Sequence, residues 1–389
     1  MITFEEATAL VIGAACPLSV ETASLSECLG RVLAADVFAD MDMPPFDKSA
    51  VDGFACRRQD MYNPLRIIET IAAGKVPVAK IGPNDCARIM TGAMLPQGAD
   101  IVMMVENTEM EGEFIRFTGS KPATNICFTA EDIHKDDKVL DSGTQIKPQH
   151  IAVLASVGCH LPIVYRKPVI GVISTGDELV EPDELALAGQ IRNSNGWQLM
   201  AQIQKAGCIA HYFGIANDSP QATEAKIIAA QDTCDIIILT GGVSMGDYDY
   251  VPGVIARAGF TTLFHNIAVQ PGKPTVFAVK DHTYLFGLPG NPVSAFVQFE
   301  LLVRLLIEKI TGCTETHFML RMPLGADYER RKSDRKSFLP VKIKFNEVFP
   351  VEYHGSAHIH AFIEADGIMS VNIGETEILK GTLVDVRQL

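Results

Sequence analysis

The sequence predicts a multidomain α/β protein built around a doubly wound, mostly parallel sheet. Strand-type and helix-type segments alternate between residues 168 and 317, whereas the regions on either side contain mainly short strand-type runs. The length of 389 residues exceeds one ordinary domain, and a hydrophobic content of 47% can fill several cores. Alternating strands and helices imply parallel strands covered by helices, a fold class that binds ligands beyond the carboxyl ends of its strands.

The N-terminal region is predicted to begin with a helix. Thr3 can cap this helix with Glu6 three residues later, and apolar residues follow at helical spacing: Phe4, Ala7, Leu10, Val11 and Ala14. The sequence CLGRVLAADVFA indicates a short strand, and DMDMPPFDKSAVDGFA is expected to be a loop. We expect residues 1–45 and 140–167 to form one α/β linking domain.

Residues 46–139 are predicted to form a β-rich domain inserted into that linking domain. Short β-type runs, such as PLRIIETI, CARIMTG, DIVMMVE and EFIRFT, are separated there by Gly, Pro and Asn. No long helical pattern occurs in this region. These features are typical of a small barrel or sandwich.

The central α/β domain is predicted to span residues 168–317. Its expected strands are 168–175, 209–215, 234–242, 262–269, 274–279 and 283–290, and its expected helices are 194–207, 219–231, 249–259 and 291–312. Residues 318–389 return to strand-type runs, at 337–346, 359–366, 368–374 and 381–387. We expect this last region to form a C-terminal β-barrel-like domain.

Composition and charge exclude several classes of function. A net charge of −14 disfavours nucleic-acid binding, because that binding needs Lys and Arg to release counterions. No apolar run reaches the roughly 20 residues needed to cross a bilayer, and the first residues, MITFEEATAL, are acidic rather than basic. The nine cysteines form no CxxC pair, which argues against a zinc knuckle or a redox motif. We therefore expect a cytoplasmic protein that binds neither nucleic acid nor a membrane.

Glycine-rich turns follow several strands of the predicted central sheet. Thr175 and Gly176 follow the first strand, TGGVSMGDYDYV follows the third, and LPGNPVS follows the last. Since parallel strands place their carboxyl ends at one edge, we expect these turns to meet there. Glycine lets backbone N–H groups approach an anion, and helix N-termini favour negative charge, so GGVS and GNPVS suit a phosphate-bearing ligand. The alternative is that the glycines only make tight turns.

Three carboxylates are expected at the same edge of the sheet: Glu178, Asp218 and Asp249. Carboxylates repel phosphate unless a hard cation lies between them, and Mg²⁺ prefers oxygen ligands and often bridges to phosphates. The alternative for Asp218, and for its neighbour candidate Asp177, is that it caps a following helix.

Three further residues are weaker candidates for ligand binding when only their residue types and neighbours are considered. Lys273, in the turn VQPGKP, offers a point charge to an oxyanion, although a surface lysine explains it equally well. Asp52 and Thr91 each precede a glycine after an apolar stretch, which favours turn residues over ligands.

Seven motifs, in chain order, resemble the MoeA family of molybdopterin molybdenumtransferases, and the gephyrin E domain is similar. The motifs are PPFDKSAVDGFA, IMTGAMLPQGAD, ISTGDELVEP, GQIRNSNG, LTGGVSMGDYDYV, VQPGKP and LFGLPGNPVSA. The resemblance extends over essentially the whole chain. It implies an elongated four-part homodimer whose cleft combines elements of both subunits, and a reaction that inserts molybdate into adenylylated molybdopterin with Mg²⁺-dependent release of AMP.

The resemblance also implies roles for individual residues. Asp52 and Thr91 resemble an N-terminal contribution that faces the partner subunit's cleft, and Glu178 and Asp249 resemble the catalytic and metal-binding acids. Asp218 joins the catalytic set, although the family usually has two aspartates where this chain has Asn217-Asp218. The residues that resemble ligand-binding positions are Thr175, Gly176, Gly241, Gly242, Ser244, Lys273, Pro289, Pro292, Ser294, Arg335 and Ser356.

Other consequences of the resemblance concern partners and departures from the family. Many relatives have Lys where this chain has Gln270, so one positive contact is missing here. A molybdopterin adenylyltransferase that supplies the substrate and molybdoenzyme chaperones that take the product are the expected protein partners. The alternative function is a non-catalytic molybdopterin-binding scaffold of the gephyrin type. Catalysis of the preceding adenylylation is disfavoured, because the enzymes for that step lack the flanking β modules.

Overall fold

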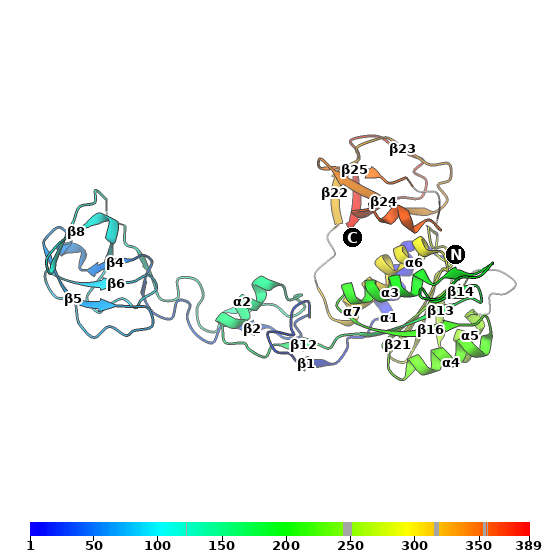
Figure 1. Cartoon of the computed structure of the whole chain (residues 1–389), viewed down its shortest axis with the longest axis horizontal. Coiled ribbons are helices and arrows are strands. Elements are labelled where there is room, and N and C mark those ends of the chain that lie inside the picture. The colour runs from blue at the N-terminus through cyan, green and yellow to red at the C-terminus, as the bar shows by residue number, and fades with distance from the viewer. Residues whose placement is uncertain (122, 244–250, 315–318, 353–354, 356) are drawn as a thin grey trace. The chain divides into compact units, whose positions relative to one another are not determined.

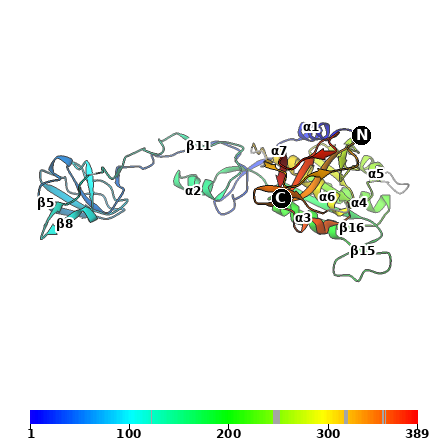
Figure 2. The same ribbon diagram turned by 90° about the horizontal axis from the view of Figure 1, so that it is seen from above.

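The computed structural model describes the chain except for residues 122, 244–250, 315–318, 353–354 and 356. Internal contacts divide it into two units, which we describe separately (Figures 1 and 2). Unit 1 contains Met1–Ala35, Gly143–Lys147 and Ile163–Leu389, and unit 2 contains Asp36–Ser142 and Pro148–Pro162. The finer division into four domains stays a prediction.

Unit 2 is built on a six-stranded sheet with the order β7-β4-β6-β5-β9-β8, drawn in blue and cyan in Figure 1. Its strands are β4 (Gly53–Cys56), β5 (Leu65–Ile71), β6 (Asp85–Ile89), β7 (Ile101–Met104), β8 (Thr108–Glu111) and β9 (Phe114–Phe117). The unit also contains two small antiparallel pairs, β2 (Val37–Phe38) with β11 (Lys138–Leu140) and β3 (Lys48–Ser49) with β10 (Ile126–Cys127). Its described helical segments are α2 (Pro148–Ser156) and the 3₁₀ turns η1 (Arg58–Asp60) and η2 (Val105–Asn107). The predicted β-rich character of this region is confirmed.

The loop predicted through VDGFA is wrong, because β4 is a strand inside the sheet, paired with both β6 and β7. Phe54 packs into the core on one face of the sheet, and Ala55 packs into the core on the other. A Cβ atom at Gly53 would lie 1.9 Å from the carbonyl oxygen of Met103, so only glycine lets the neighbouring strand approach. Four residues that include Gly and Ala are too few to show a strand periodicity.

The predicted N-terminal helix and its cap are confirmed in unit 1. Helix α1 spans Phe4–Ala14, the Glu6 N–H donates to Thr3 Oγ1 at 3.1 Å, and the Thr3 N–H donates to Glu6 Oε2 at 2.8 Å. The helix buries Ala7 and Val11 against the core of the central sheet. Strand β1 (Val20–Thr22) then pairs antiparallel with β12 (Ile163–Tyr165).

The predicted α/β centre is confirmed, and its six-stranded sheet is mixed, with the order β16-β13-β17-β21-β20-β18. The strands are β13 (Val169–Thr175), β16 (Ile209–Ala216), β17 (Ile236–Thr240), β18 (Thr261–Phe264), β20 (Val276–Lys280) and β21 (Thr283–Leu288). The first four in the order pair in parallel, and the last two pair antiparallel with their neighbours. Only two residues join β20 to β21, and so short a connection requires antiparallel strands.

Helices cover both faces of this sheet (Figure 1). Ile236 and Ile238 of β17 pack into the core shared with α1 and α3 (Ser194–Lys205), whereas Ile237 packs on the other face with α4 (Pro220–Gln231) and α5 (Val251–Arg257). The helix predicted over 291–312 is confirmed as consecutive helical parts. These are α6 (Pro292–Gln298), a π-helical turn η3 (Phe299–Val303) and α7 (Arg304–Ile310).

The C-terminal part of unit 1 contains a sheet with the order β19-β24-β26-β28-β22, and β25 pairs with β24. Its strands are β19 (Val269–Gln270), β22 (Met319–Pro323), β24 (Lys336–Lys344), β25 (Glu347–Pro350), β26 (Gly367–Val371) and β28 (Leu383–Gln388), and β23 (Tyr328–Glu329) pairs with β27 (Glu377–Ile378). The predicted strand 262–269 is thus divided, because β18 ends at Phe264 and β19 joins this second sheet. Closure into a barrel stays a prediction.

The strand predicted at 359–366 is wrong, because Ile359–Phe362 form a 3₁₀ turn, η4. The Phe362 ring lies 4.7 Å from the ring of Phe296 in α6, measured between centroids. The apolar residues that suggested a strand are therefore used in a contact with the central domain. Among the residues that the structure describes, no helix is both long enough and apolar enough to span a membrane.

Candidate functional site

A cavity of about 740 Å³ lies at the carboxyl ends of β13, β17 and β21, where the sequence predicts the site. It brings together most of the predicted residues of the central domain: Thr175, Gly176, Glu178, Asp218, Gly241, Gly242, Pro289 and Pro292. The register explains this convergence, since Ser174 at the end of β13 pairs with Thr240 of β17, and Thr240 pairs with Leu288 of β21. We call this space the strand-end cavity.

A smaller cavity of about 340 Å³ adjoins the strand-end cavity, and the two share Pro274, Pro289 and Asn291 as lining residues. The predicted residues Lys273, Ser294 and Arg335 line it. Two of these three carry a positive charge, although they come from separate segments of an acidic chain. We call this space the cationic cavity.

Several predicted residues are not placed at these cavities. Ser244, Asp249 and Ser356, together with Asp247, lie outside the residues that the structure describes. Asp52 and Thr91 belong to unit 2, where the Asp52 carboxylate accepts the N–H of Thr91 at 2.7 Å and its hydroxyl at 2.9 Å. The hydrogen bonds from the backbone and side chain of Thr91 lower the pKa of Asp52. The two residues thus form one local pair, and their part in catalysis stays a prediction.

The glycines of the strand-end cavity adopt conformations that other residues rarely adopt. Gly241 has φ +99°, and a Cβ atom there would lie 2.5 Å from the Thr175 carbonyl oxygen. Gly176 has φ +146°, and its Cβ would lie 2.3 Å from Glu178 Oε2. Gly241 therefore holds its turn close to the end of β13, whereas the close atoms at Gly176 belong to the side chain of Glu178. The sequence left open whether these glycines only make tight turns.

Gly241→Ala is expected to lower the free energy of unfolding by about 2–4 kcal/mol, because it combines a left-handed backbone with a steric clash. Gly189→Ala is the matched control, since Gly189 has φ +86° and nothing within 4 Å of the added methyl group. The free energy of unfolding of this control is expected to fall by only about 1 kcal/mol. Urea unfolding of both variants measures the difference, and equal losses would contradict the clash.

Two carboxylates of the described chain, Glu178 and Asp218, line the strand-end cavity and are exposed to solvent. Asp218 does not cap α4, because Ser219 is the N-cap residue and accepts the Ala222 N–H at 3.1 Å. Asp177 and Asp218 instead accept each other's backbone N–H groups, at 3.0 and 3.3 Å. This exchange fixes the two strand-end turns next to one another.

The donor set at this edge fits a magnesium ion that is completed by a substrate. No group of three or more His, Cys, Asp or Glu side chains suited to a metal occurs within the described ranges. Mg²⁺ is commonly held by one or two carboxylates together with phosphate oxygens rather than by an all-protein cage. Glu178 and Asp218 supply two such carboxylates beside turns suited to phosphate.

Sequence reasoning missed several polar residues that line the strand-end cavity, among them Arg192, Asn193 and Asn195. All three lie in the motif GQIRNSNG, at the end of β15 (Ile191–Arg192) and the start of α3. Asn195 Nδ2 donates to the Gly290 carbonyl at 2.7 Å and to Thr240 Oγ1 at 3.0 Å, so it ties α3 to two strand ends. A run of polar residues directly before a predicted helix was the available signal.

A hydrogen-bonded chain holds one wall of the strand-end cavity. Tyr212 of β16 donates to Glu181 Oε1 at 2.6 Å and accepts from Asn193 Nδ2 at 2.6 Å, and Trp197 Nε1 donates to Glu181 Oε2 at 3.1 Å. Asn193 in turn caps α3 by accepting the Gly196 N–H. Glu181 directly follows β14 (Leu179–Val180), which pairs with β15. The chain therefore connects the segment that carries Glu178 to the N-terminus of α3.

Tyr212→Phe is expected to lower the free energy of unfolding by about 1–2 kcal/mol at neutral pH, because Glu181 loses a hydrogen-bond donor. Burial and the hydrogen bond to Glu181 raise the pKa of Tyr212 above its usual 10. The folded state thus holds this proton more tightly, and the resulting stability is present below pH 10 and lost as the pH rises further. Urea unfolding followed by Trp197 fluorescence at pH 7.5, 9.5 and 10.5 should show a smaller alkaline loss in the variant. An equal loss in both proteins would contradict this.

Three family models match the chain, in order along its length. The MoeA N-terminal region (domain I and II) matches residues 2–158, the probable molybdopterin binding domain matches residues 171–309, and the MoeA C-terminal region (domain IV) matches residues 323–389. The second match contains the strand-end cavity's turns at 175–178, 217–218 and 240–243.

Curated proteins and a solved structure are similar over most of the chain. A molybdopterin molybdenumtransferase of Staphylococcus aureus (strain Mu50 / ATCC 700699) is 33% identical over 399 residues, which cover 99% of this chain and 95% of that protein. One of Bacillus subtilis (strain 168) is 39% identical over 300 residues, with 74% and 70% coverage. The crystal structure of the molybdopterin biosynthesis moeA protein from Pyrococcus horikoshii OT3 is 28% identical, with a TM-score of 0.86 and complete coverage of both chains.

Proposed function

We propose a function from the premise that the chain belongs to the MoeA family of molybdopterin molybdenumtransferases. In this proposal, the chain binds adenylylated molybdopterin in the strand-end cavity and molybdate in the cationic cavity. The chain is a transferase of molybdenum cofactor biosynthesis. The observation that carries the proposal is that a cavity with glycine turns and carboxylates adjoins a cavity with Lys273 and Arg335.

The charges of the two cavities suit two different anions. Molybdate is a small tetrahedral dianion, and Lys273, Arg335 and the Ser294 hydroxyl can hold its oxygens. Ser294 lies in the first turn of α6, so the positive N-terminal end of that helix also faces this region. A net charge of −14 repels molybdate at long range, so a local cationic cavity is needed to bind it.

The diphosphate of the adenylylated substrate suits the strand-end cavity. The backbone at Gly176, Gly241 and Gly242 can approach its phosphate oxygens without a Cβ atom in the way. Arg192 is a cation at the same wall. Glu178 and Asp218, joined by Asp249, would hold a magnesium ion that neutralises phosphate charge.

The reaction that this arrangement supports balances in atoms and charge. One molybdate oxygen attacks the adenylate phosphorus, the phosphoanhydride bond breaks, and AMP leaves with that oxygen. The two dithiolene sulfurs bond to molybdenum, and their protons leave with a second oxygen as water. The residues of this chain contribute by fixing molybdate beside the phosphoanhydride and by stabilising its charge, which is preorganised electrostatic catalysis.

Several finer points belong to the same proposal and rest on the resemblance. We propose a cytoplasmic homodimer in which Asp52 and Thr91 face the partner subunit's cleft, with four domains that end in a barrel-like module. Ser244 and Ser356 would add contacts to substrate and molybdate. Partner proteins would deliver the adenylylated substrate and accept the finished cofactor.

The proposal is tested by incubating purified full-length protein with adenylylated molybdopterin, molybdate and Mg²⁺. We expect one AMP and one molybdenum cofactor per substrate, with no AMP when molybdate is left out. Binding of the substrate without AMP release would instead identify a scaffold of the gephyrin type. AMP release without cofactor formation would show hydrolysis alone and would also refute the proposal.

A further inference from the structure

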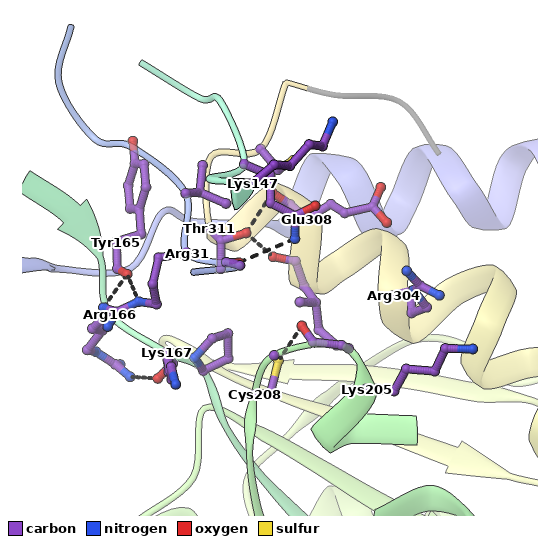
Figure 3. A pocket seen from close by; sticks show the side chains of 18 residues that line it. Arg31, Lys147, Tyr165, Arg166, Lys167, Lys205, Cys208, Arg304, Glu308 and Thr311 are labelled. Atoms are coloured by element: carbon purple, nitrogen blue, oxygen red, sulfur yellow. Dashed lines mark hydrogen bonds between the residues drawn. The ribbon is translucent and has the colours of Figure 1, made fainter. Parts of the chain in front are cut away.

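A third cavity, of about 260 Å³, shares no lining residue with the strand-end or cationic cavity. Its walls come from the segments around Arg31 and 165–168, from the end of α3 and from α7 (Figure 3). Six of its lining residues are basic, and one is acidic, in a chain with more acidic than basic residues. The basic set is Arg31, Lys147, Arg166, Lys167, Lys205 and Arg304.

Three of these cations are already paired with carboxylates. Arg31 pairs with Glu21 at 2.5 Å, and Arg304 pairs with Glu300 at 3.0 Å. Arg166 donates to both carboxylate oxygens of Asp235. Lys147 and the one acidic lining residue, Glu308, have interactions of their own, and their opposite formal charges cancel.

Lys167 and Lys205 account for the remaining charge. In the described part of the chain, neither ammonium group has a hydrogen-bonding or ion-pair partner. Helices α3 and α7 end at this cavity, and each C-terminus carries about half a negative charge. Two unpaired lysines against two such helix ends leave an excess of about one positive charge, so the cavity attracts anions.

Cys208, which lines the cavity, does not repel an anion. In Figure 3, Cys208 lies between Lys167 on one side and Lys205 and Arg304 on the other. Burial raises the pKa of the Cys208 thiol to about 12, with a smaller contribution from Asp235, while Arg304 and Lys167 act on it in the opposite direction. The thiol is therefore neutral at physiological pH, and cations from two separate walls act on the same point.

We propose that this cavity binds a phosphate group, which lies over Cys208 and is held by Lys167 from one wall and by Lys205 and Arg304 from the other. A tetrahedral oxyanion has enough acceptors to meet cations from several directions. The volume lies below the range of about 300–1,000 Å³ that is typical of sites for drug-sized ligands, which favours a single phosphate group over a whole nucleotide inside the cavity.

This site lies at the opposite ends of β13 and α3 from the strand-end cavity. Lys167 precedes β13, whose other end carries Thr175 of the strand-end cavity. Lys205 ends α3, whose first residues line the same strand-end cavity. A phosphate bound here would thus tie together the far ends of a strand and a helix that form the active site.

The test measures binding of ³²P-labelled inorganic phosphate to the full-length protein by equilibrium dialysis at low ionic strength. The Lys273→Ala background weakens competing binding in the cationic cavity. We expect one saturable site per chain, and binding at least about tenfold weaker in the double variant Lys167→Gln/Lys205→Gln. The double variant Lys167→Arg/Lys205→Arg is expected to keep the site.

Lys75→Gln/Lys80→Gln is the matched control, because it changes the net charge equally at two exposed lysines of unit 2. If this control weakens binding as much as Lys167→Gln/Lys205→Gln does, or if the latter binds phosphate as the parent does, the proposal is wrong. Competition by AMP distinguishes the source of the phosphate group. Displacement indicates a nucleotide whose phosphate enters the cavity, and no displacement indicates the free anion.

Discussion

Glu178→Gln is expected to reduce molybdate-dependent AMP release by about 10²-fold, which is the usual effect of removing one preorganised charge from a catalytic site. Glu178 lines the strand-end cavity, and its carboxylate is one of two described there beside the glycine turns. The amide keeps the shape of the side chain but is a poorer ligand for a hard cation. The loss should be partly restored by raising the Mg²⁺ concentration.

A readout other than activity separates this role from a structural one. AMP binding, measured by calorimetry at increasing Mg²⁺, should need more Mg²⁺ in the variant than in the parent protein. Glu109→Gln is the matched control, since it removes the same charge at an exposed position in unit 2. An unchanged Mg²⁺ requirement in Glu178→Gln would exclude this residue from the metal site.

Lys273→Ala is expected to raise the molybdate concentration needed for half-maximal AMP release by about 10- to 100-fold. The side chain lines the cationic cavity with Arg335, and a hydrogen bond to a charged group contributes about 1.5–3 kcal/mol. The KM for adenylylated molybdopterin should change little, because we propose that this substrate binds in the neighbouring strand-end cavity. Initial rates at varied molybdate measure the effect.

Two further variants test this prediction, one as a control and one by adding a positive charge. Lys332→Ala removes an exposed lysine that lines none of the described cavities around the site, and it should leave the molybdate dependence unchanged. Gln270→Lys adds a cation to the lining of the cationic cavity and should lower the molybdate requirement. If Lys273→Ala and Lys332→Ala behave alike, molybdate does not bind in the cationic cavity.

Segments with a clear periodicity could be predicted from the sequence. The Thr3–Glu6 capping box, the helices α3 and α4 and the strands of the central sheet follow from apolar spacing and turn residues alone. Short or atypical segments could not. Strand β4 contains Gly53, whose role depends on the approach of Met103 from a neighbouring strand, and η4 depends on the contact of Phe362 with Phe296.

The candidate site shows the same division. Thr175, Gly241 and Pro289 could be predicted, because each lies at the end of a strand that the sequence predicts. Arg192 and Asn195 could not, since their importance comes from the register that brings α3 beside the ends of β17 and β21. Asp218 was correctly expected at the cavity, but only the structure distinguished Ser219 as the cap of α4.

The sequence by itself determined the family, the α/β centre and the chemical types of the site, because motifs and periodicity are local properties. Only the tertiary structure decided that Lys273, Ser294 and Arg335 line one cavity beside the strand-end turns. These residues are far apart in the chain, and their meeting depends on β19 pairing with β24 and on α6 packing against both sheets. The same long-range packing created the third cavity, which Cys208 lines and for which no local sequence pattern exists.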